Sequence, residues 1–481
     1  MPESLSGSPD ALVARRSMTA VTDQTTPPQT AESTEPKTES HDPAVPAAYA
    51  AFMREGWGDR ELDLPARPVA ERAAERRRRL AEAFPGERLV LPAGGFKVRA
   101  NDTDYRFRPD TAHTYFSGNQ TSDAVLVVDD GESVLYARPR SSRETDEFFR
   151  DRRYGELWVG RRPSLREISD SLGIEVRHID DLPSFDDDRK TRDVTTDDDL
   201  ARVADELRLV KDAWEVEQLQ AACDITTLGF EDSVREWDEV LRYGERWIEG
   251  TFFRRARAMG NDIGYDSIVG GGSHAATLHW IDNTGPITPG TLVLLDMGVE
   301  NRSLYTADVT RTLPVDGRFT DLQRELYEIV LKAQQAGMDA VRPGAAFRAA
   351  HNAAMDVLAH ALADLGLLPV SAEEALDPES RVYARWTLHG TSHMLGMDVH
   401  DCGRAAPAAY AEGTLAEGMV LTVEPGLYFQ EDDLLVPAEL RGTGIRIEDD
   451  ILVTADGCDN LSGALPRTSA DVEAWMDAHR R

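Results

Sequence analysis

The sequence predicts an α+β protein with two folded domains behind an N-terminal tail. At 481 residues the chain is too long for one ordinary domain, and its hydrophobic fraction of 41% is enough to build separate cores. Short apolar runs alternate with helical stretches in the first half, and glycine-bounded strands alternate with helices beyond residue 265. We therefore expect a tail over residues 1–44, an α/β domain with its linker over 45–199, and a second domain over 200–481.

The first segments differ sharply in composition. Residues 1–44 are rich in Ser, Thr, Pro and Glu and have no periodic apolar face, which predicts disorder. Strong helix formers run from Val69 to Leu80, and we interpret the basic cluster among them as a solvated helix face. Clusters of Pro, Gly and Asp then separate short apolar runs, which predict strands at 88–91, 124–128 and 134–137.

The charge of the chain excludes some partners. Its 53 basic and 86 acidic residues give a formal net charge of −33, which would repel the phosphate backbone of nucleic acids. We interpret the Asp-rich stretch Asp180–Asp199 as a solvated linker in preference to an acidic partner-binding surface. The sequence contains neither a membrane-length apolar stretch nor a secretory pattern at its start, so we expect no membrane partner and a cytoplasmic location.

The three cysteines do not suggest a disulfide framework. Cys223, Cys402 and Cys458 are odd in number, far apart and outside any CxxC pair, so we expect reduced thiols. A nucleophilic role for Cys402 is disfavoured because no base and orienting group surround it in the sequence.

The second domain opens with a helix and continues into strands that end in acidic residues. An apolar stripe predicts a helix from Glu206 to Phe230, and another is expected over Asp321–Val341. The apolar run 291–296 delivers Asp296 at its end. Residues 305–312 look like the return strand of a hairpin that presents Asp308 on one face.

Four acids and one histidine in this domain suggest a metal centre. A carboxylate beside a buried strand must be paired, hydrogen-bonded or metal-bound, because burying it alone costs several kcal/mol. Each acid by itself also has an ordinary explanation as a turn residue, a cap or part of a surface ion pair. The segment 388–401, however, holds three of the eleven histidines, and imidazole is a common ligand of borderline metals. The full set is Asp296, Asp308, His393, Glu424 and Glu448, which suits manganese, cobalt or zinc in a hydrolytic dimetal centre.

The spans around these residues resemble, in order, the signatures of the pita-bread metallopeptidases. Among these the chain is most similar to the proline-specific branch, aminopeptidase P, over about residues 66–465. Residues 101–118 resemble the family's creatinase/prolidase-like N-terminal domain, which implies that the domain over 45–199 is non-catalytic. The resemblance implies a C-terminal pita-bread catalytic domain, and the spans that carry it are 295–298, 307–312, 389–393, 423–428 and 446–450.

The resemblance also implies roles for the five ligands. Asp296 would bind one metal ion through both oxygens, Asp308 and Glu448 would bridge two ions, and His393 and Glu424 would complete the shell of the second. The implied cofactor is two divalent ions per subunit, and manganese is the metal usual in relatives.

Five further residues are implied at the substrate site. His279, His389 and His400 would line the pocket, and Arg446 and Tyr428 would support it. The expected mechanism uses a metal-bridging hydroxide to attack the carbonyl before proline. Glu424 would transfer the proton, and His389 or His400 would donate a hydrogen bond to the developing charge.

The predicted function is release of the N-terminal residue from peptides with proline in the second position. The main alternative is an Xaa-Pro dipeptidase, which shares every motif named above. A non-catalytic pita-bread protein or a metal-free enzyme such as a creatine amidinohydrolase is disfavoured because all five ligand positions are filled. A methionine aminopeptidase is disfavoured by the long preceding domain. The expected partners are such peptides and copies of the chain itself, as a dimer or tetramer like the relatives.

Overall fold

A computed structural model describes residues 44–480, so the predicted disordered tail lies outside the described residues apart from its last position. The chain divides into two compact units. Among the described residues, the small unit combines 44–60 with Arg140–Arg162, and the large unit combines Glu61–Pro139 with 163–480.

The small unit contains three short helices, and pairs of aromatic rings contact one another within it. The rings of Tyr49 and Phe149 meet edge to face at 5.8 Å, and those of Trp57 and Phe148 meet at 5.1 Å. Such edge-to-face pairs add to the burial of their apolar area. The helices are α1 (Ala47–Arg54), α4 (Glu147–Arg150) and α5 (Glu156–Val159).

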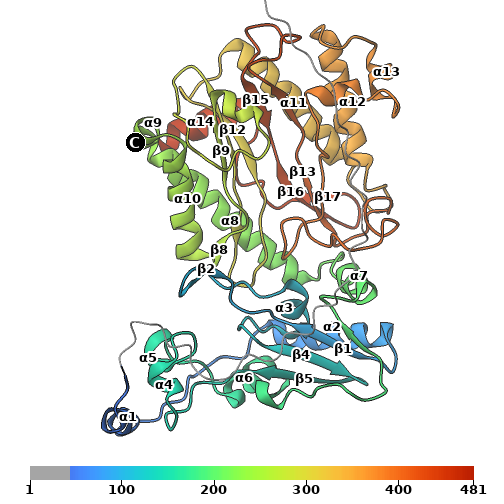
Figure 1. Ribbon diagram of the computed structural model, residues 1–481. Helices are drawn as coiled ribbons and strands as arrows, with labels where there is room; N and C mark the ends of the chain where they lie inside the picture. The colour runs from blue at the N-terminus through green and yellow to red at the C-terminus, as the bar shows by residue number, and fades with distance from the viewer. Residues whose placement is uncertain (1–43, 481) are drawn as a thin grey trace, which may run out of the picture. The chain divides into compact units, whose positions relative to one another are not determined.

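The large unit begins with a five-stranded mixed sheet in the order β6-β5-β4-β1-β7. Its strands include the three predicted from the apolar runs, which are confirmed. Helices α2 and α3 contact each other, and α2 also contacts β4 (Figure 1). The elements are α2 (Val69–Ala83), β1 (Arg88–Pro92), α3 (Thr111–Ser117), β4 (Val125–Asp129), β5 (Glu132–Ala137), α6 (Leu165–Leu172), β6 (Glu175–His178), β7 (Thr191–Asp193) and α7 (Asp198–Glu206), with the small ribbon β2 (Val98–Ala100) and β3 (Thr103–Asp104).

The prediction of a solvated linker over Asp180–Asp199 was wrong in part. Strand β7 lies within it and pairs in parallel with β1, Arg88 opposite Thr191. Arg192 explains why so acidic a stretch enters a sheet: its guanidinium contacts Glu87 and donates to Asp197 at 2.9 Å. Arg192 thereby neutralises acidic side chains whose charge would otherwise favour a fully solvated segment.

The predicted helix from Glu206 to Phe230 begins later than expected, at Ala213. Helix α7 ends at Glu206, and the intervening residues join a different part of the fold, because Lys211 N–H donates to Gly418 O at 2.8 Å. Asp212 then caps the new helix, accepting from the Trp214 and Glu215 amides. A capping box therefore restarts the helix after the break.

Small antiparallel sheets and long helices form the rest of the large unit. The sheets are β12-β10-β9, β13-β16-β17, β14-β15 and β11-β8. Figure 1 shows α11 and α12 packed side by side, and α8 beside α10. The helices are α8 (Ala213–Arg235), α9 (Trp237–Tyr243), α10 (Glu245–Met259), α11 (Asp321–Ala340), α12 (Ala349–Asp364), α13 (Ala372–Leu376) and α14 (Ser469–His479). The strands are β8 (Asp262–Ile263), β9 (Ile268–Gly271), β10 (Leu292–Asp296), β11 (Val299–Glu300), β12 (Thr310–Pro314), β13 (Val420–Val423), β14 (Gly426–Phe429), β15 (Thr443–Arg446), β16 (Asp449–Val453) and β17 (Cys458–Asn460).

The connection between Asp296 and Asp308 is more than the simple hairpin that was predicted. Strands β10 and β12 pair with Asp296 opposite Thr310, so Asp308 precedes the return strand instead of lying in it. Between them β11 leaves to pair with β8. Gly298 allows this crossing, because a Cβ there would meet the carbonyl oxygen of Ala307 at 1.7 Å.

Two further observations concern the whole described chain. Within residues 44–480, no helix combines the length and apolar character needed to cross a bilayer. All three cysteines are free thiols, as expected, and Cys223 and Cys402 are buried.

Candidate metal centre

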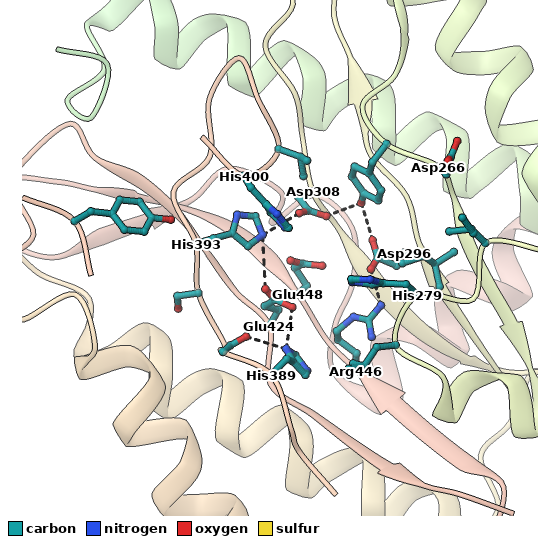
Figure 2. A pocket seen from close by; sticks show the side chains of 18 residues that line it. Asp266, His279, Asp296, Asp308, His389, His393, His400, Glu424, Arg446 and Glu448 are labelled. Atoms are coloured by element: carbon teal, nitrogen blue, oxygen red, sulfur yellow. Dashed lines mark hydrogen bonds and ion pairs between the residues drawn. The ribbon is translucent and has the colours of Figure 1, made fainter. Parts of the chain in front are cut away.

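Nine of the ten predicted site residues line one cavity of about 660 Å³. Figure 2 shows the side chains converging on it from several strands and loops. The nine are His279, Asp296, Asp308, His389, His393, His400, Glu424, Arg446 and Glu448. The tenth, Tyr428, is 2% exposed and does not line the cavity. The structure therefore places Tyr428 behind the wall, where it can act only through other side chains.

The acids reach the cavity because strands end there. Asp296 is the last residue of β10, Glu424 follows β13 directly, and Glu448 joins β15 to β16. Backbone hydrogen bonds tie two of these ends to neighbouring segments: Glu424 N–H donates to Thr391 O at 2.9 Å, and Glu448 N–H donates to Thr310 O at 3.1 Å. Segments far apart in sequence thus deliver their carboxylates to one place.

Asp308, His393 and Glu448 form the tightest group. Each offers one ligand atom, and these atoms all lie within 4.8 Å of one another. His393 Nε2 lies 3.3 Å from Asp308 Oδ2 and 3.6 Å from Glu424 Oε1. Its other ring nitrogen, Nδ1, lies 3.2 Å from Met394 O. A proton on Nδ1 would be donated to that carbonyl and leave the Nε2 lone pair directed at the carboxylates, which is the orientation a metal ligand needs.

Tyr265 connects Asp296 to Asp308. Its hydroxyl lies 2.6 Å from Asp296 Oδ1 and 2.5 Å from Asp308 Oδ1. The second oxygen of Asp296 accepts from Arg446 Nη2 at 2.5 Å. Sequence reasoning missed Tyr265, because a lone tyrosine before a strand carries no local signal of a role in binding carboxylates.

The carboxylates crowd one another inside the protein. Burial raises the pKa of Asp296 and of Glu448, and neighbouring carboxylates raise both further. Burial also raises the pKa of Glu424, to about 7. For His393, burial acts to lower the pKa, but Asp308 and Glu424 outweigh it and raise the pKa to about 9. The Arg446 guanidinium offsets part of this negative charge, and divalent ions would supply further positive charge. The donor set therefore fits a metal centre.

A hydrogen-bonded chain leads from Arg446 to His389. Arg446 Nη1 donates to the Tyr428 hydroxyl at 3.0 Å, and that hydroxyl lies 2.8 Å from His389 Nε2. Burial and the Arg446 charge lower the pKa of His389 to about 4, so its ring is neutral. His389 Nδ1 lies 2.8 Å from Gly390 O, which fixes the proton on Nδ1 and leaves Nε2 to accept from Tyr428.

The ring of His400 packs against the ring of His393. Their ring centres are 4.3 Å apart with the rings nearly edge to face. Burial and the neighbouring His393 lower the pKa of His400. The next residue, Asp401, is 1% exposed and accepts from Lys211 Nζ at 3.0 Å, so a buried ion pair holds the loop that carries His400.

Comparison with known proteins places this site in a family. The model of metallopeptidase family M24 matches residues 217–455, and that of the aminopeptidase P N-terminal domain matches 73–193. "Xaa-Pro aminopeptidase 1" of Streptomyces coelicolor is 50% identical over 477 residues, which cover 94% of this chain and 96% of that protein. The chain belongs to the aminopeptidase P family.

More distant members of the aminopeptidase P family show the same relationship. Xaa-Pro aminopeptidase of Escherichia coli is 32% identical, with 84% of this chain and 97% of that protein covered. The structure of Pseudomonas aeruginosa aminopeptidase PepP superposes with a TM-score of 0.77 at 30% identity, covering 86% of this chain and 99% of that one. The predicted α+β fold class, with its pita-bread domain, is confirmed, and so is membership of a metallopeptidase family.

Proposed function

We propose that this protein is a dimetal aminopeptidase that releases the N-terminal residue from peptides with proline in the second position. The observation that carries the proposal is the convergence of Asp308, His393 and Glu448 ligand atoms within 4.8 Å in the main cavity. The names of the relatives, Xaa-Pro aminopeptidases, supply the substrate class.

The proposed cofactor is two divalent ions, with manganese as the metal. Asp296, Asp308, His393, Glu424 and Glu448 would hold these ions through their carboxylate and imidazole groups. When bound, such ions polarise a peptide carbonyl and lower the pKa of water. Arg446 and Tyr265 hold the Asp296 carboxylate from behind, so that its orientation is fixed before substrate arrives.

The chain's own side chains supply proton transfer and hydrogen bonds. Glu424 lies between two histidines, with Oε1 at 3.6 Å from His393 and Oε2 at 3.4 Å from His389. We assign it the transfer of a proton from the attacking water to the leaving amine. His400, in the cavity wall, is placed to donate a hydrogen bond to the carbonyl oxygen as charge develops there. His389 also lines the cavity, but its one N–H is directed at Gly390 O and its Nε2 accepts from Tyr428, so of the two candidate histidines we assign this role to His400.

Three broader statements belong to the same proposal. We infer that the catalytic domain begins near residue 200, that the subunits associate as a dimer or tetramer, and that the enzyme works in the cytoplasm. The first is supported by the family match starting at residue 217. The other two rest on the resemblance and on composition, and sedimentation of the purified protein tests the oligomeric state.

Substrate length separates the proposal from its closest rival. We expect the purified protein to release arginine from Arg-Pro-Pro at least as efficiently as it cleaves the dipeptide Ala-Pro. The measurement is release of the N-terminal residue from both peptides under the same conditions, with Arg-Ala-Pro as the control for proline in the second position. Cleavage confined to Ala-Pro would instead identify an Xaa-Pro dipeptidase.

A further inference from the structure

One wall of the cavity comes from the segment 271–285, called here the His279 segment. Leu278, His279 and Ile281 from this segment line the cavity, and Ile281 is 48% exposed. Side chains that face an open cavity contribute little packing to hold their own backbone in place. The segment must therefore be fixed from its other side.

Glu245, the first residue of α10, lies on that other side and is fully buried. Its carboxylate accepts four hydrogen bonds from the His279 segment. Oε1 lies 2.8 Å from both Gly271 N and His274 Nδ1, and Oε2 lies 2.9 Å from Trp280 Nε1 and 2.6 Å from Gly285 N. These contacts reach the beginning, the middle and the end of the segment.

The chemistry of the four partners explains why this position holds a carboxylate. Two are backbone N–H groups and one is an indole N–H, all of which can only donate. An ionised carboxylate accepts at both oxygens, so it satisfies every one of these groups. A glutamine of the same shape would satisfy only those facing its oxygen and would present N–H groups to the others, which leaves buried donors unpaired.

Trp280 transmits this constraint to the cavity wall. Its ring stacks on His274 with the ring centres 3.9 Å apart, and both side chains bond to Glu245. Trp280 does not line the cavity, whereas its neighbours His279 and Ile281 do. A tight turn, in which Ile281 N–H donates to His279 O at 3.1 Å, connects the two neighbours. Anchoring the indole on one side therefore fixes His279 and Ile281 on the other.

Asn283 provides a second attachment, to strand β9. It is 1% exposed, its Oδ1 accepts from Val269 N at 3.0 Å, and its Nδ2 donates to Ser267 O at 2.9 Å. Its backbone adopts a φ of 48°, which asparagine tolerates better than most residues. Asn283 therefore holds the far end of the segment independently of Glu245. Loss of the Glu245 contacts should then displace mainly the middle of the segment, which carries His274, His279 and Trp280.

We propose that Glu245 is a positioning residue for the substrate wall: through Trp280, His274 and two backbone amides it orients His279 toward the peptide. The inference rests on the proposed function only for the identity of the substrate. It assigns Glu245 no contact with the substrate, since the carboxylate is buried behind the wall.

The test is Glu245→Gln compared with Glu249→Gln, the same change one turn later on α10, where the side chain is only partly buried. We expect Glu245→Gln to lower kcat/KM for Arg-Pro-Pro about tenfold, mainly through KM, because the displaced residues hold the substrate. Glu249→Gln should stay within about twofold of the wild type. Metal content should match the wild type in both variants, because none of the proposed ligands is touched.

A double-mutant cycle with His279→Ala tests whether Glu245 acts through His279. If it does, Glu245→Gln should change kcat/KM less than about twofold once His279 is gone. An equal tenfold loss in both backgrounds, a loss of metal, or wild-type kinetics in Glu245→Gln would overturn the proposal. Should Glu245→Gln fail to fold, Trp280→Phe removes the hydrogen bond to Glu245 and replaces the indole with a smaller aromatic ring. It should show a loss of about threefold with the same dependence on His279, and wild-type kinetics there would equally overturn the proposal.

Hydrogen exchange separates a failure of this inference from a failure of the proposed function. Backbone amides of residues 271–285 should exchange faster in Glu245→Gln than in Glu249→Gln, whatever the substrate. A wild-type protein that does not cleave Arg-Pro-Pro contradicts the proposed function alone. Unchanged exchange across the segment contradicts the positioning role alone.

Discussion

Replacing Asp308 with alanine should reduce Arg-Pro-Pro hydrolysis about 1,000-fold or more and remove metal from the purified protein. Asp308 lies at the centre of the cluster: it is 3.3 Å from His393 and shares the Tyr265 hydroxyl with Asp296. Loss of its carboxylate removes one of the groups proposed to hold the ions. The measurements are the metal content per subunit and kcat/KM on the same preparation.

The variant should nevertheless stay folded. Its Tyr265 hydroxyl keeps Asp296 as an acceptor, and one fewer carboxylate reduces repulsion within a buried acidic cluster. Asp339→Ala on the exposed face of α11 is the matched control and should retain both metal and activity. An Asp308→Ala protein that kept full metal content and turnover would show that the proposed ligand assignment is wrong.

Replacing Arg311 with methionine should lower the free energy of unfolding by about 3–5 kcal/mol, because it breaks a buried ion pair and leaves its partners behind. Arg311 is 1% exposed. Its Nη2 lies 2.7 Å from Asp449 Oδ1, and its other donors reach the carbonyl oxygens of Thr310, Glu448, Leu465 and Pro466. This one side chain therefore ties β12 to the turn that carries Glu448 and to the segment before α14.

Chemical denaturation of Arg311→Met and Arg318→Met measures this effect under identical conditions. Arg318 makes its ion pairs at the surface with 56% of its side chain exposed, so the same substitution there should cost less than about 1 kcal/mol. Equal midpoints for the two variants would contradict the structural role assigned to Arg311.

The strand-end acids could be predicted from sequence because their signal is local. A run of apolar residues that stops at an acid, as at Asp296 or Glu424, shows both the strand and the unusual position of the charge. The order of five motifs, which include these two strand ends, then indicated the family. The histidines of segment 388–401 were found in the same way, since their density is visible without a structure.

Other contributors could not be predicted because their partners are distant in sequence. Tyr265 contacts acids 31 and 43 positions away, and Glu245 bonds to residues 26 to 40 positions on. Neither has a neighbour in the sequence that reveals the contact. The start of α8 was misplaced for a similar reason. The residues before Asp212 favour a helix locally, but the Lys211 N–H donates to the carbonyl oxygen of Gly418, which is distant in sequence.

The most direct test of the central claim is metal analysis joined to Arg-Pro-Pro hydrolysis, before and after chelation and after adding back Mn²⁺, Co²⁺ or Zn²⁺. We expect about two divalent ions per subunit in the active protein. Activity should disappear as the metal is removed and return when it is restored, most fully with manganese. Hydrolysis that continued after complete removal of metal would contradict the assignment of Asp296, Asp308, His393, Glu424 and Glu448 as a catalytic metal centre.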